Sequence, residues 1–156
     1  MKLSELTPNF STLIGGGALL SVATDDGRVN TMTVSWGTAG VLWGKEVCTV
    51  FVRPERHTFT LCEDADKMTL SFFGDKRKQT LAFCGTKSGA DVDKFKACDL
   101  KYKIEDGFVT FEDAKFTLRL KVLYADDLKK EAFSHTGPLK FYENGGFHRA
   151  YTCEVV

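Results

Sequence analysis

The 156-residue chain lacks the features that mark several classes of protein. Its 21 basic and 21 acidic residues cancel, so it has no electrostatic footprint for nucleic acid or an acidic membrane. Its longest uncharged apolar stretch, Leu13 to Ala23, is interrupted by three glycines and is too short to cross a bilayer. Residues 1–9 have no cationic head before an apolar core, so no signal peptide is predicted. We expect a cytoplasmic protein that binds neither nucleic acid nor membranes.

The cysteines and histidines are spaced unlike those of a disulfide framework or a metal site. The cysteines are odd in number and contain no C-x-x-C pair: Cys48, Cys62, Cys84, Cys98 and Cys153. Reduced thiols fit a cytosolic chain. The three histidines lack the i, i+4 spacing of a helical metal pair: His57, His135 and His148. The sequence therefore predicts no metal site.

The sequence contains enough apolar residues to form one hydrophobic core. It is 43% hydrophobic and 12% aromatic, which excludes disorder, and its length is that of one domain spanning residues 1–156. Period-two alternation dominates, with Phe116 to Tyr124 apolar at every even position and polar at 117, 119 and 121. This pattern predicts a strand with one wet face. Residues 47–52 and 68–73 are apolar on both parities, as expected of central strands.

Turn signals place these strands in hairpins. Asp25 to Arg28 separates the strand-like runs 19–24 and 29–36, and Glu105 to Gly107 separates 101–104 from 108–111. Helical signals are short: one stretch begins near Arg53-Pro54, Asp75 is expected to cap 76–83, and Ser88 or Asp91 to cap the stretch through Phe95. The sequence thus predicts a mainly β, closed or nearly closed barrel of about six to eight strands with a few short helices, rather than βαβ units.

Three segments carry polar groups suited to a ligand, and each has a plain structural alternative. Thr31, Thr33 and Ser35 place a row of hydroxyls on one face of a strand, which either meets a polar ligand or faces solvent. Arg53 to Thr58 follows an apolar strand and suits a dianionic phosphate, or else is a solvated helix start. The turn Cys84 to Gly89 brings backbone amides close to an anion, or simply connects two helices.

Taken together and in order, four segments resemble the flavin reductase-like family, and more closely its flavoredoxin-type branch. They are Asn30-Thr31-Met32-Thr33-Val34-Ser35-Trp36-Gly37, Val52-Arg53-Pro54-Glu55-Arg56-His57-Thr58, Leu70-Ser71-Phe72-Phe73 and Cys84-Gly85-Thr86-Lys87-Ser88-Gly89-Ala90-Asp91-Val92-Asp93-Lys94. The resemblance runs from about Gly15 to Asp126. It implies an FMN-binding split β-barrel of Greek-key type, with FMN held non-covalently, and a homodimer with the flavin at or near the subunit interface.

The resemblance also implies a role for each segment. The flavin ring and ribityl chain would be lined by Met32, Thr33, Ser35 and Trp36. The phosphate or ribityl hydroxyls would be reached by Arg53 and Thr58, and the ring would lie beside Ser71 and Phe72. The phosphate end would be closed by Cys84, Gly85 and Ser88. Two C-terminal aromatics, Tyr142 and Phe147, are interpreted either as lid residues or as core.

By the same resemblance the chemistry belongs to the flavin, so no catalytic side chain is expected. Hydride would pass from NAD(P)H to the flavin, and the chain contains no G-x-G-x-x-G unit to hold a nicotinamide nucleotide firmly. Three functions stay open. They are an NAD(P)H:flavin oxidoreductase, a flavoredoxin-type electron carrier that takes electrons from a redox protein, and a barrel that only binds an apolar ligand or partner.

Overall fold

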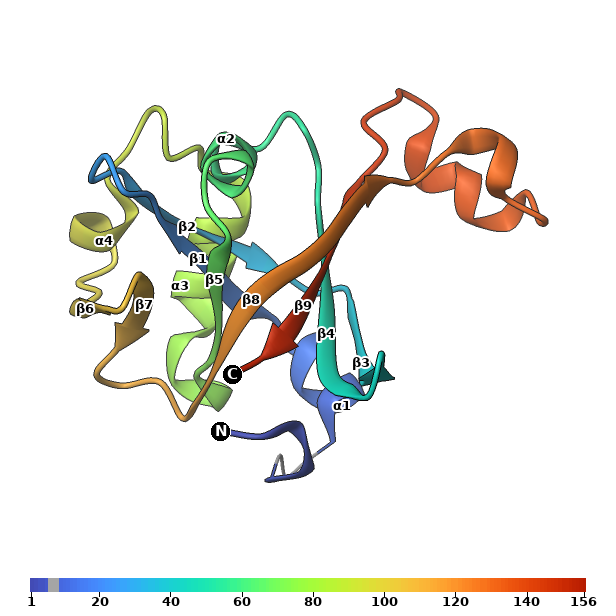
Figure 1. Cartoon of the computed structure of the whole chain (residues 1–156). Coiled ribbons are helices and arrows are strands. Elements are labelled where there is room, and N and C mark those ends of the chain that lie inside the picture. The colour runs from blue at the N-terminus through green and yellow to red at the C-terminus, as the bar shows by residue number, and fades with distance from the viewer. Residues whose placement is uncertain (6–8) are drawn as a thin grey trace.

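The computed structural model describes residues 1–5 and 9–156. Its main sheet has seven antiparallel strands in the order β2-β1-β5-β8-β9-β4-β3, and β6 and β7 form a separate pair (Figure 1). The strands are β1 (Ala18–Ala23), β2 (Val29–Val34), β3 (Gly37–Leu42), β4 (Lys45–Val52), β5 (Lys67–Phe72), β6 (Tyr102–Glu105), β7 (Phe108–Phe111), β8 (Phe116–Asp127) and β9 (Arg149–Val155). The α-helices are α1 (Phe10–Gly15), α2 (His57–Glu63), α3 (Lys78–Thr86) and α4 (Lys94–Ala97), and the 3₁₀ turns are η1 (Leu3–Glu5), η2 (Gly74–Arg77), η3 (Lys130–Ala132) and η4 (Gly137–Tyr142).

Both hairpins predicted from turn residues are confirmed. β1 pairs with β2 from Ala18↔Val34 to Ala23↔Val29, and Gly27 in the connecting turn has φ of +87°. β6 pairs with β7 from Tyr102↔Phe111 to Glu105↔Phe108, with Gly107 at φ of +82°. Glycine adopts such angles without a steric cost, so an Asp-Gly pair between two strand-like runs indicates a hairpin turn.

The main sheet curls around one interior, because alternate residues from six of its strands form a single buried cluster. β5 contributes Met68, Leu70 and Phe72, and β8 contributes Leu118 and Leu120. α1 and α2 add Ile14, Leu61 and Cys62 at the ends. β2 and β3 are the two edges of the sheet, and β2 contacts β4 across the opening. The predicted fold class, a mainly β barrel with short helices, is confirmed.

A second cluster covers the outer face of β1. It joins Leu19 of β1 to Leu81 and Cys84 of α3, Phe95 of α4 and Phe111 of β7. Both faces of β1 are therefore buried. β5 is buried on both faces as well, since Thr69 and Ser71 have no exposed surface. These observations explain the apolar or small residues at both parities of these strands.

The helix boundaries differ from those predicted. Residues 53–56 form a turn, with the Arg56 amide donating to the Arg53 carbonyl at 3.1 Å, so α2 begins only at His57. Asp75 lies within η2 and pairs with Lys78 at 2.9 Å instead of capping a helix. Asp93, rather than Ser88 or Asp91, caps α4 by accepting from the Lys96 amide at 3.1 Å. Strand β3 was not predicted, because as an exposed edge strand it shows no alternation.

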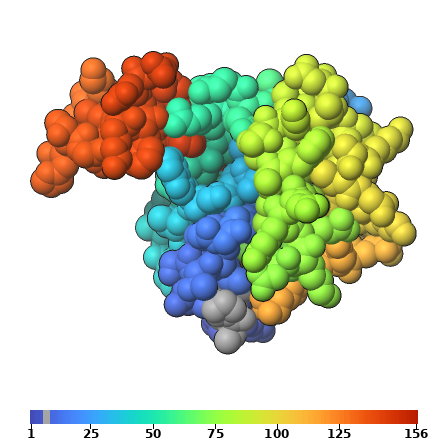
Figure 2. Space-filling model, turned by 180° about the vertical axis from the view of Figure 1, so that it is seen from behind, coloured from blue at the N-terminus to red at the C-terminus, as the bar shows by residue number. Residues whose placement is uncertain are grey.

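β8 extends beyond the barrel and carries the chain away from it. Its apolar alternation holds through Val122, where a register shift against β9 occurs, and Tyr124 is consequently exposed. The far end pairs Asp127 with Arg149, and the chain between them, residues 128–148, projects from the body as shown in orange and red in Figures 1 and 2. We call residues 128–148 the C-terminal arm. No helix in the described part of the chain is long and apolar enough to cross a membrane.

Candidate functional site

The candidate site is a pocket of about 320 Å³ over the opening of the barrel. Its lining residues come from four places: the end of β2, the segment between β2 and β3, β4 with the turn after it, and the residue before β9. Its lining residues are Met32, Thr33, Val34, Ser35, Trp36, Phe51, Arg53, Arg56 and His148. Because β2 pairs only with β1, one side of its backbone has no strand partner next to the pocket. On this side the Thr31 carbonyl accepts from the Lys94 ammonium at 2.9 Å, while the edge next to Thr33 has no strand partner.

Two arginines of the turn after β4 form hydrogen bonds to segments on opposite sides of the pocket. Arg53 donates to the carbonyls of Phe141 at 2.7 Å and Gly146 at 3.2 Å, both in the C-terminal arm. Arg56 donates to the carbonyls of Gly85 at 2.8 Å and Cys84 at 3.2 Å, near the end of α3. Both guanidinium groups also line the pocket, so they bring positive charge to it.

Beneath the α3 side lies a buried lysine. Lys94 is 2% exposed, and its ammonium donates to the carbonyls of Thr31 at 2.9 Å and Cys84 at 3.0 Å. Burial lowers the pKa of Lys94 to about 8. The lysine therefore joins the pocket strand β2 to α3.

Aromatic rings form the opposite wall. Trp36, which is 45% exposed, packs edge-on against Phe141 with ring centroids 5.0 Å apart and lies 5.3 Å from the His148 ring. Within the arm, Tyr142 stacks on Phe147 at 4.5 Å and an interplanar angle of 10°. Tyr142 and Phe147 thus pack the arm itself, while Phe141 is the arm residue that meets the pocket wall.

His148 is neutral at physiological pH. Burial, reinforced by the positive charge of Arg53, lowers its pKa to about 4. The Tyr142 hydroxyl lies 2.7 Å from Nδ1 and has this nitrogen as its hydrogen-bond partner. We assign the hydroxyl as donor, which places the ring proton on Nε2 and makes that nitrogen a hydrogen-bond donor.

The structure brings together part of the predicted site. Met32, Thr33, Ser35, Trp36 and Arg53 all line the pocket. Gly85 adjoins it, since a Cβ there would lie 3.4 Å from that of Thr33. The Cys84 carbonyl is held by Arg56, but its thiol points into the outer cluster.

The other predicted residues lie elsewhere. The Thr58 hydroxyl is buried and accepts from the Asn30 amide at 2.9 Å. Ser71 contacts the Thr117 hydroxyl at 3.2 Å, and Phe72 belongs to the barrel interior. Ser88 lies on the loop after α3, where its hydroxyl accepts from the Ala90 amide at 3.2 Å. None of these four residues lines the pocket.

Of the three hydroxyls predicted to form one row, those of Thr31 and Thr33 are engaged within the protein, whereas Ser35, just after β2, is exposed and lines the pocket. Thr31 has no exposed surface, and its hydroxyl lies 2.8 Å from that of Ser21. Thr33 donates to the Leu81 carbonyl at 2.6 Å because α3 covers this face of the strand. Sequence reasoning did not assign Phe51, Arg56 and His148 to the site. Arg56 lay within a motif already singled out, whereas the other two had no local signal.

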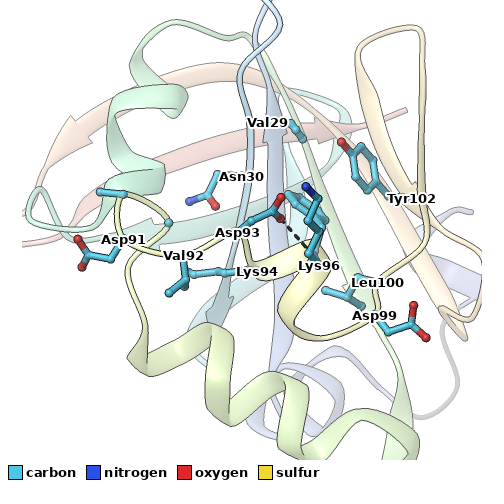
Figure 3. Close-up of a pocket in the computed structure, with 13 residues that line it drawn as sticks. Val29, Asn30, Asp91, Val92, Asp93, Lys94, Lys96, Asp99, Leu100 and Tyr102 are labelled. Carbon is cyan, nitrogen blue, oxygen red and sulfur yellow. Dashed lines mark hydrogen bonds between the residues drawn. The ribbon is translucent and has the colours of Figure 1, made fainter.

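A larger hollow of about 570 Å³ lies between β2, the loop 88–93, α4 and β6 (Figure 3). Three aspartates line it, Asp91, Asp93 and Asp99, together with two lysines. The Lys94 ammonium is engaged with the carbonyls of Thr31 and Cys84, which leaves Lys96 as the available cation against three carboxylates. This balance of charge disfavours a phosphate-bearing ligand. The smaller pocket, with two guanidinium groups and an aromatic wall, is the better candidate.

Comparison with known proteins gives the family. The family model described as "Flavin reductase like domain" matches residues 10–155. The chain belongs to the flavin reductase-like family. A search of curated proteins finds no significant match.

Solved structures show the same fold. An FMN-binding protein from Thermus thermophilus with bound 1-cyclohex-2-enone is 24% identical, with a TM-score of 0.71 over 97% of this chain and 74% of that one. Flavoredoxin from Methanosarcina acetivorans is 15% identical, with a TM-score of 0.70 over 90% and 65%. The NADH:FAD oxidoreductase SgcE6 of Streptomyces globisporus C-1027 is 13% identical, with a TM-score of 0.68 over 91% and 73%. This flavin reductase-like chain is accordingly a split barrel.

Proposed function

We propose that the chain binds FMN non-covalently in the pocket between Met32 and His148 and passes electrons from NAD(P)H through the flavin to an acceptor. The observation that carries this proposal is the convergence of Met32, Thr33, Ser35, Trp36 and Arg53 on one pocket of a flavin reductase-like chain. The FMN-binding neighbour from Thermus thermophilus adds support for the choice of flavin.

The residues present fit such a cofactor. The unpaired edge of β2 would offer hydrogen bonds to the polar atoms of a flavin ring, and Trp36 and Phe51 would offer aromatic surface to it. Arg53 and Arg56 supply positive charge for a phosphate or for an anionic reduced ring. When bound, the flavin supplies the hydride chemistry; the chain positions it and excludes water from one face.

A nicotinamide nucleotide would bind transiently over the exposed flavin face, because the chain has no Rossmann motif to hold it. Neutral His148 offers a hydrogen-bond donor on the arm side of this approach. These residues bind and orient; none is required to act as an acid or a base.

Electron transfer without NAD(P)H oxidation is the second candidate. Its support is the exposed aromatic pair at the mouth of the pocket, with Trp36 45% and Phe141 48% exposed, and the flavoredoxin fold neighbour. Exposed aromatic surface beside a redox centre suits a protein donor or acceptor.

The visible spectrum of the purified protein, followed by anaerobic addition of NADH and then NADPH, tests the proposal. A yellow protein bleached by either nucleotide supports the oxidoreductase. A yellow protein inert to both, but reduced by a redox protein, supports the carrier. A colourless protein that also fails to bind added FMN would overturn both and leave the barrel as a binding module.

We propose further that the chain is a homodimer located in the cytoplasm. The β3 edge and the turn after it expose Val41 (77%), Leu42 (42%) and Trp43 (60%), an unusual set for a solvated edge strand. The five free thiols fit a reducing compartment. Analytical sedimentation of the wild type and of Trp43→Glu tests the dimer. A wild type that sediments as a monomer would contradict it. A wild-type dimer that becomes a monomer in Trp43→Glu would place the interface at the β3 edge.

A further inference from the structure

Lys94 is a buried cation without a carboxylate partner in the described part of the chain. It is the one charged side chain among the largest fully buried side chains there, and its two hydrogen-bond partners are the neutral carbonyls of Thr31 and Cys84. Every ion pair among the described residues involves other groups. Burying an ammonium group without a counter-charge is costly, and a methionine of similar length would not carry this cost. The charge therefore indicates a partner that does not belong to the chain.

A second cation approaches the same carbonyl from the pocket side. Arg56 Nη2 donates to the Cys84 oxygen at 3.2 Å, and Lys94 Nζ donates to that oxygen at 3.0 Å. Arg56 lines the pocket, whereas Lys94 lies buried behind the α3 wall. Lys94 therefore acts on a ligand in the pocket through its electric field and through the position of Arg56, not by contact.

Lys94 also determines which part of the β2 edge stays open. Its ammonium occupies the Thr31 carbonyl. Because alternate residues of a strand turn their backbone groups to the same side, Thr33 is the next residue whose N–H and carbonyl face the unpaired side. Thr33 and Arg56 both line the pocket. One buried ammonium thus holds β2 and α3 together beside the place where a polar ligand would meet them.

The ammonium form of Lys94 prevails at neutral pH. Burial lowers the pKa of Lys94 to about 8, so the side chain is mostly protonated at pH 7. Neither Arg56 nor the Cys84 thiol, whose pKa burial raises to about 12, supplies a negative charge at this pH. A negative charge that arrives in the pocket is therefore stabilised by two cations.

We propose that Lys94 is a positioning residue for the flavin pocket, which acts with Arg56 to favour the reduced, negatively charged ring over the oxidised, neutral one. This inference rests on the proposed function. The phosphate of FMN carries the same charge in both redox states, so a cation that serves the phosphate strengthens the binding of both equally. A cation that serves the ring strengthens the binding of the reduced state selectively and so raises the reduction potential of the bound flavin.

The test compares the wild type with Lys94→Met, which keeps the length of the side chain and removes its charge. Fluorescence titration gives the Kd of oxidised FMN, and anaerobic equilibration with a redox dye gives the potential of the bound flavin. We expect the affinity for reduced FMN to fall about tenfold more than that for oxidised FMN, which lowers the two-electron potential by about 30 mV. Loss of packing alone would weaken both states and leave the potential unchanged.

Lys96→Met is the matched control, because Lys96 is exposed on the same helix, and it should leave the potential unchanged. Urea denaturation of the flavin-free variants checks that they fold. Should Lys94→Met fail to fold, Arg56→Gln and Arg56→Lys decide the matter. The potential should fall in the first, which loses the charge, and be kept in the second.

Three outcomes would overturn the proposal: a potential that neither Lys94→Met nor Arg56→Gln alters, equal weakening of both redox states, or an equal fall in Lys96→Met. If the wild type binds FMN, each of these outcomes removes this inference alone. A wild type that does not bind FMN would overturn the proposed function and this inference together.

Discussion

The two walls of the pocket are tied to one turn by neighbouring arginines, yet they are built differently. The α3 wall, held by Arg56, is backed by the outer cluster and by the buried Lys94. The arm wall, held by Arg53, is backed by ring stacking and by the Tyr142–His148 hydrogen bond. Neither buried cluster contains a residue of the C-terminal arm. We therefore expect the α3 wall to unfold together with the body of the protein, whereas the arm should open locally at a lower free-energy cost.

The largest contrast should appear between two phenylalanines. Phe72→Ala removes a ring from the barrel interior and should lower the free energy of unfolding by about 3–5 kcal/mol. Phe147→Ala removes a half-buried ring whose aromatic neighbours, Phe133 and Tyr142, belong to the arm, and should leave the free energy of global unfolding nearly unchanged. Urea denaturation measures both. Equal losses would show that the arm belongs to the same cooperative unit as the barrel.

Lys94 sharpens the comparison on the α3 side. Lys94→Met leaves the Thr31 carbonyl without its donor and should cost about 1–3 kcal/mol in unfolding free energy. The folded pKa of about 8 lies below the unfolded value of 10.5, so the unfolded chain binds more protons between these pH values. Wild-type stability should therefore gain from this lysine as pH rises through that window.

The control is the variant's own pH profile. Lys94→Met should lack the gain between pH 8 and 10.5, and outside this window its stability should change with pH in parallel with that of the wild type. Identical profiles for the two proteins would mean that the buried ammonium keeps an ordinary pKa.

Arg53→Ala tests the arm wall and the flavin proposal together. It removes the donor to Phe141 and Gly146 and one positive charge from the pocket. FMN affinity should fall about tenfold, roughly 1.4 kcal/mol, and proteolysis within residues 128–148 should quicken. Fluorescence titration and limited digestion report the two effects separately. Arg53→Lys is the matched variant, since it keeps the charge without the forked geometry.

The smallest expected effect concerns the Tyr142–His148 pair. The folded pKa of His148 is about 4 against 6.5 when unfolded, so the unfolded chain binds more protons between these values. Stability from the neutral ring is thus present above pH 6.5 and is lost as pH falls towards 4. Hydrogen exchange in the arm should rise over this range.

Tyr142→Phe removes the hydroxyl that donates a hydrogen bond to His148 Nδ1. It should lower the opening free energy of the arm by about 1 kcal/mol at neutral pH, so that hydrogen exchange in the arm becomes faster. The barrel strands serve as the internal reference. Exchange that rises in the barrel to the same extent would place His148 in the global, not the local, equilibrium.

Local chemistry made much of the fold predictable. The Asp-Gly turns gave both hairpins, and the alternation from Phe116 gave β8 up to its register shift. The edge strand β3 carries no such pattern, because neither of its faces is buried. Helix starts were misplaced where a 3₁₀ turn or a loop aspartate competed with the expected cap, as at Asp75 and Asp93.

The site was predictable where its residues are contiguous. The end of β2 and the turn after β4 supplied Met32, Thr33, Ser35, Trp36 and Arg53. His148 reaches the pocket only because β9 pairs with β4, placing Arg149 opposite Val52. Pairing between strands so distant in sequence leaves no local trace, and neither does the burial of Thr58 and Phe72 away from the pocket.

The C-terminal arm begins and ends at the same end of the β8–β9 strand pair. Asp127 pairs with Arg149, and the Leu128 amide donates to the His148 carbonyl at 2.9 Å. A segment anchored in this way can be lengthened, shortened or exchanged for another without altering any contact of the barrel interior. Evolution, or a protein engineer, can therefore change what reaches the mouth of the pocket by rewriting about twenty residues while the rest of the chain stays the same.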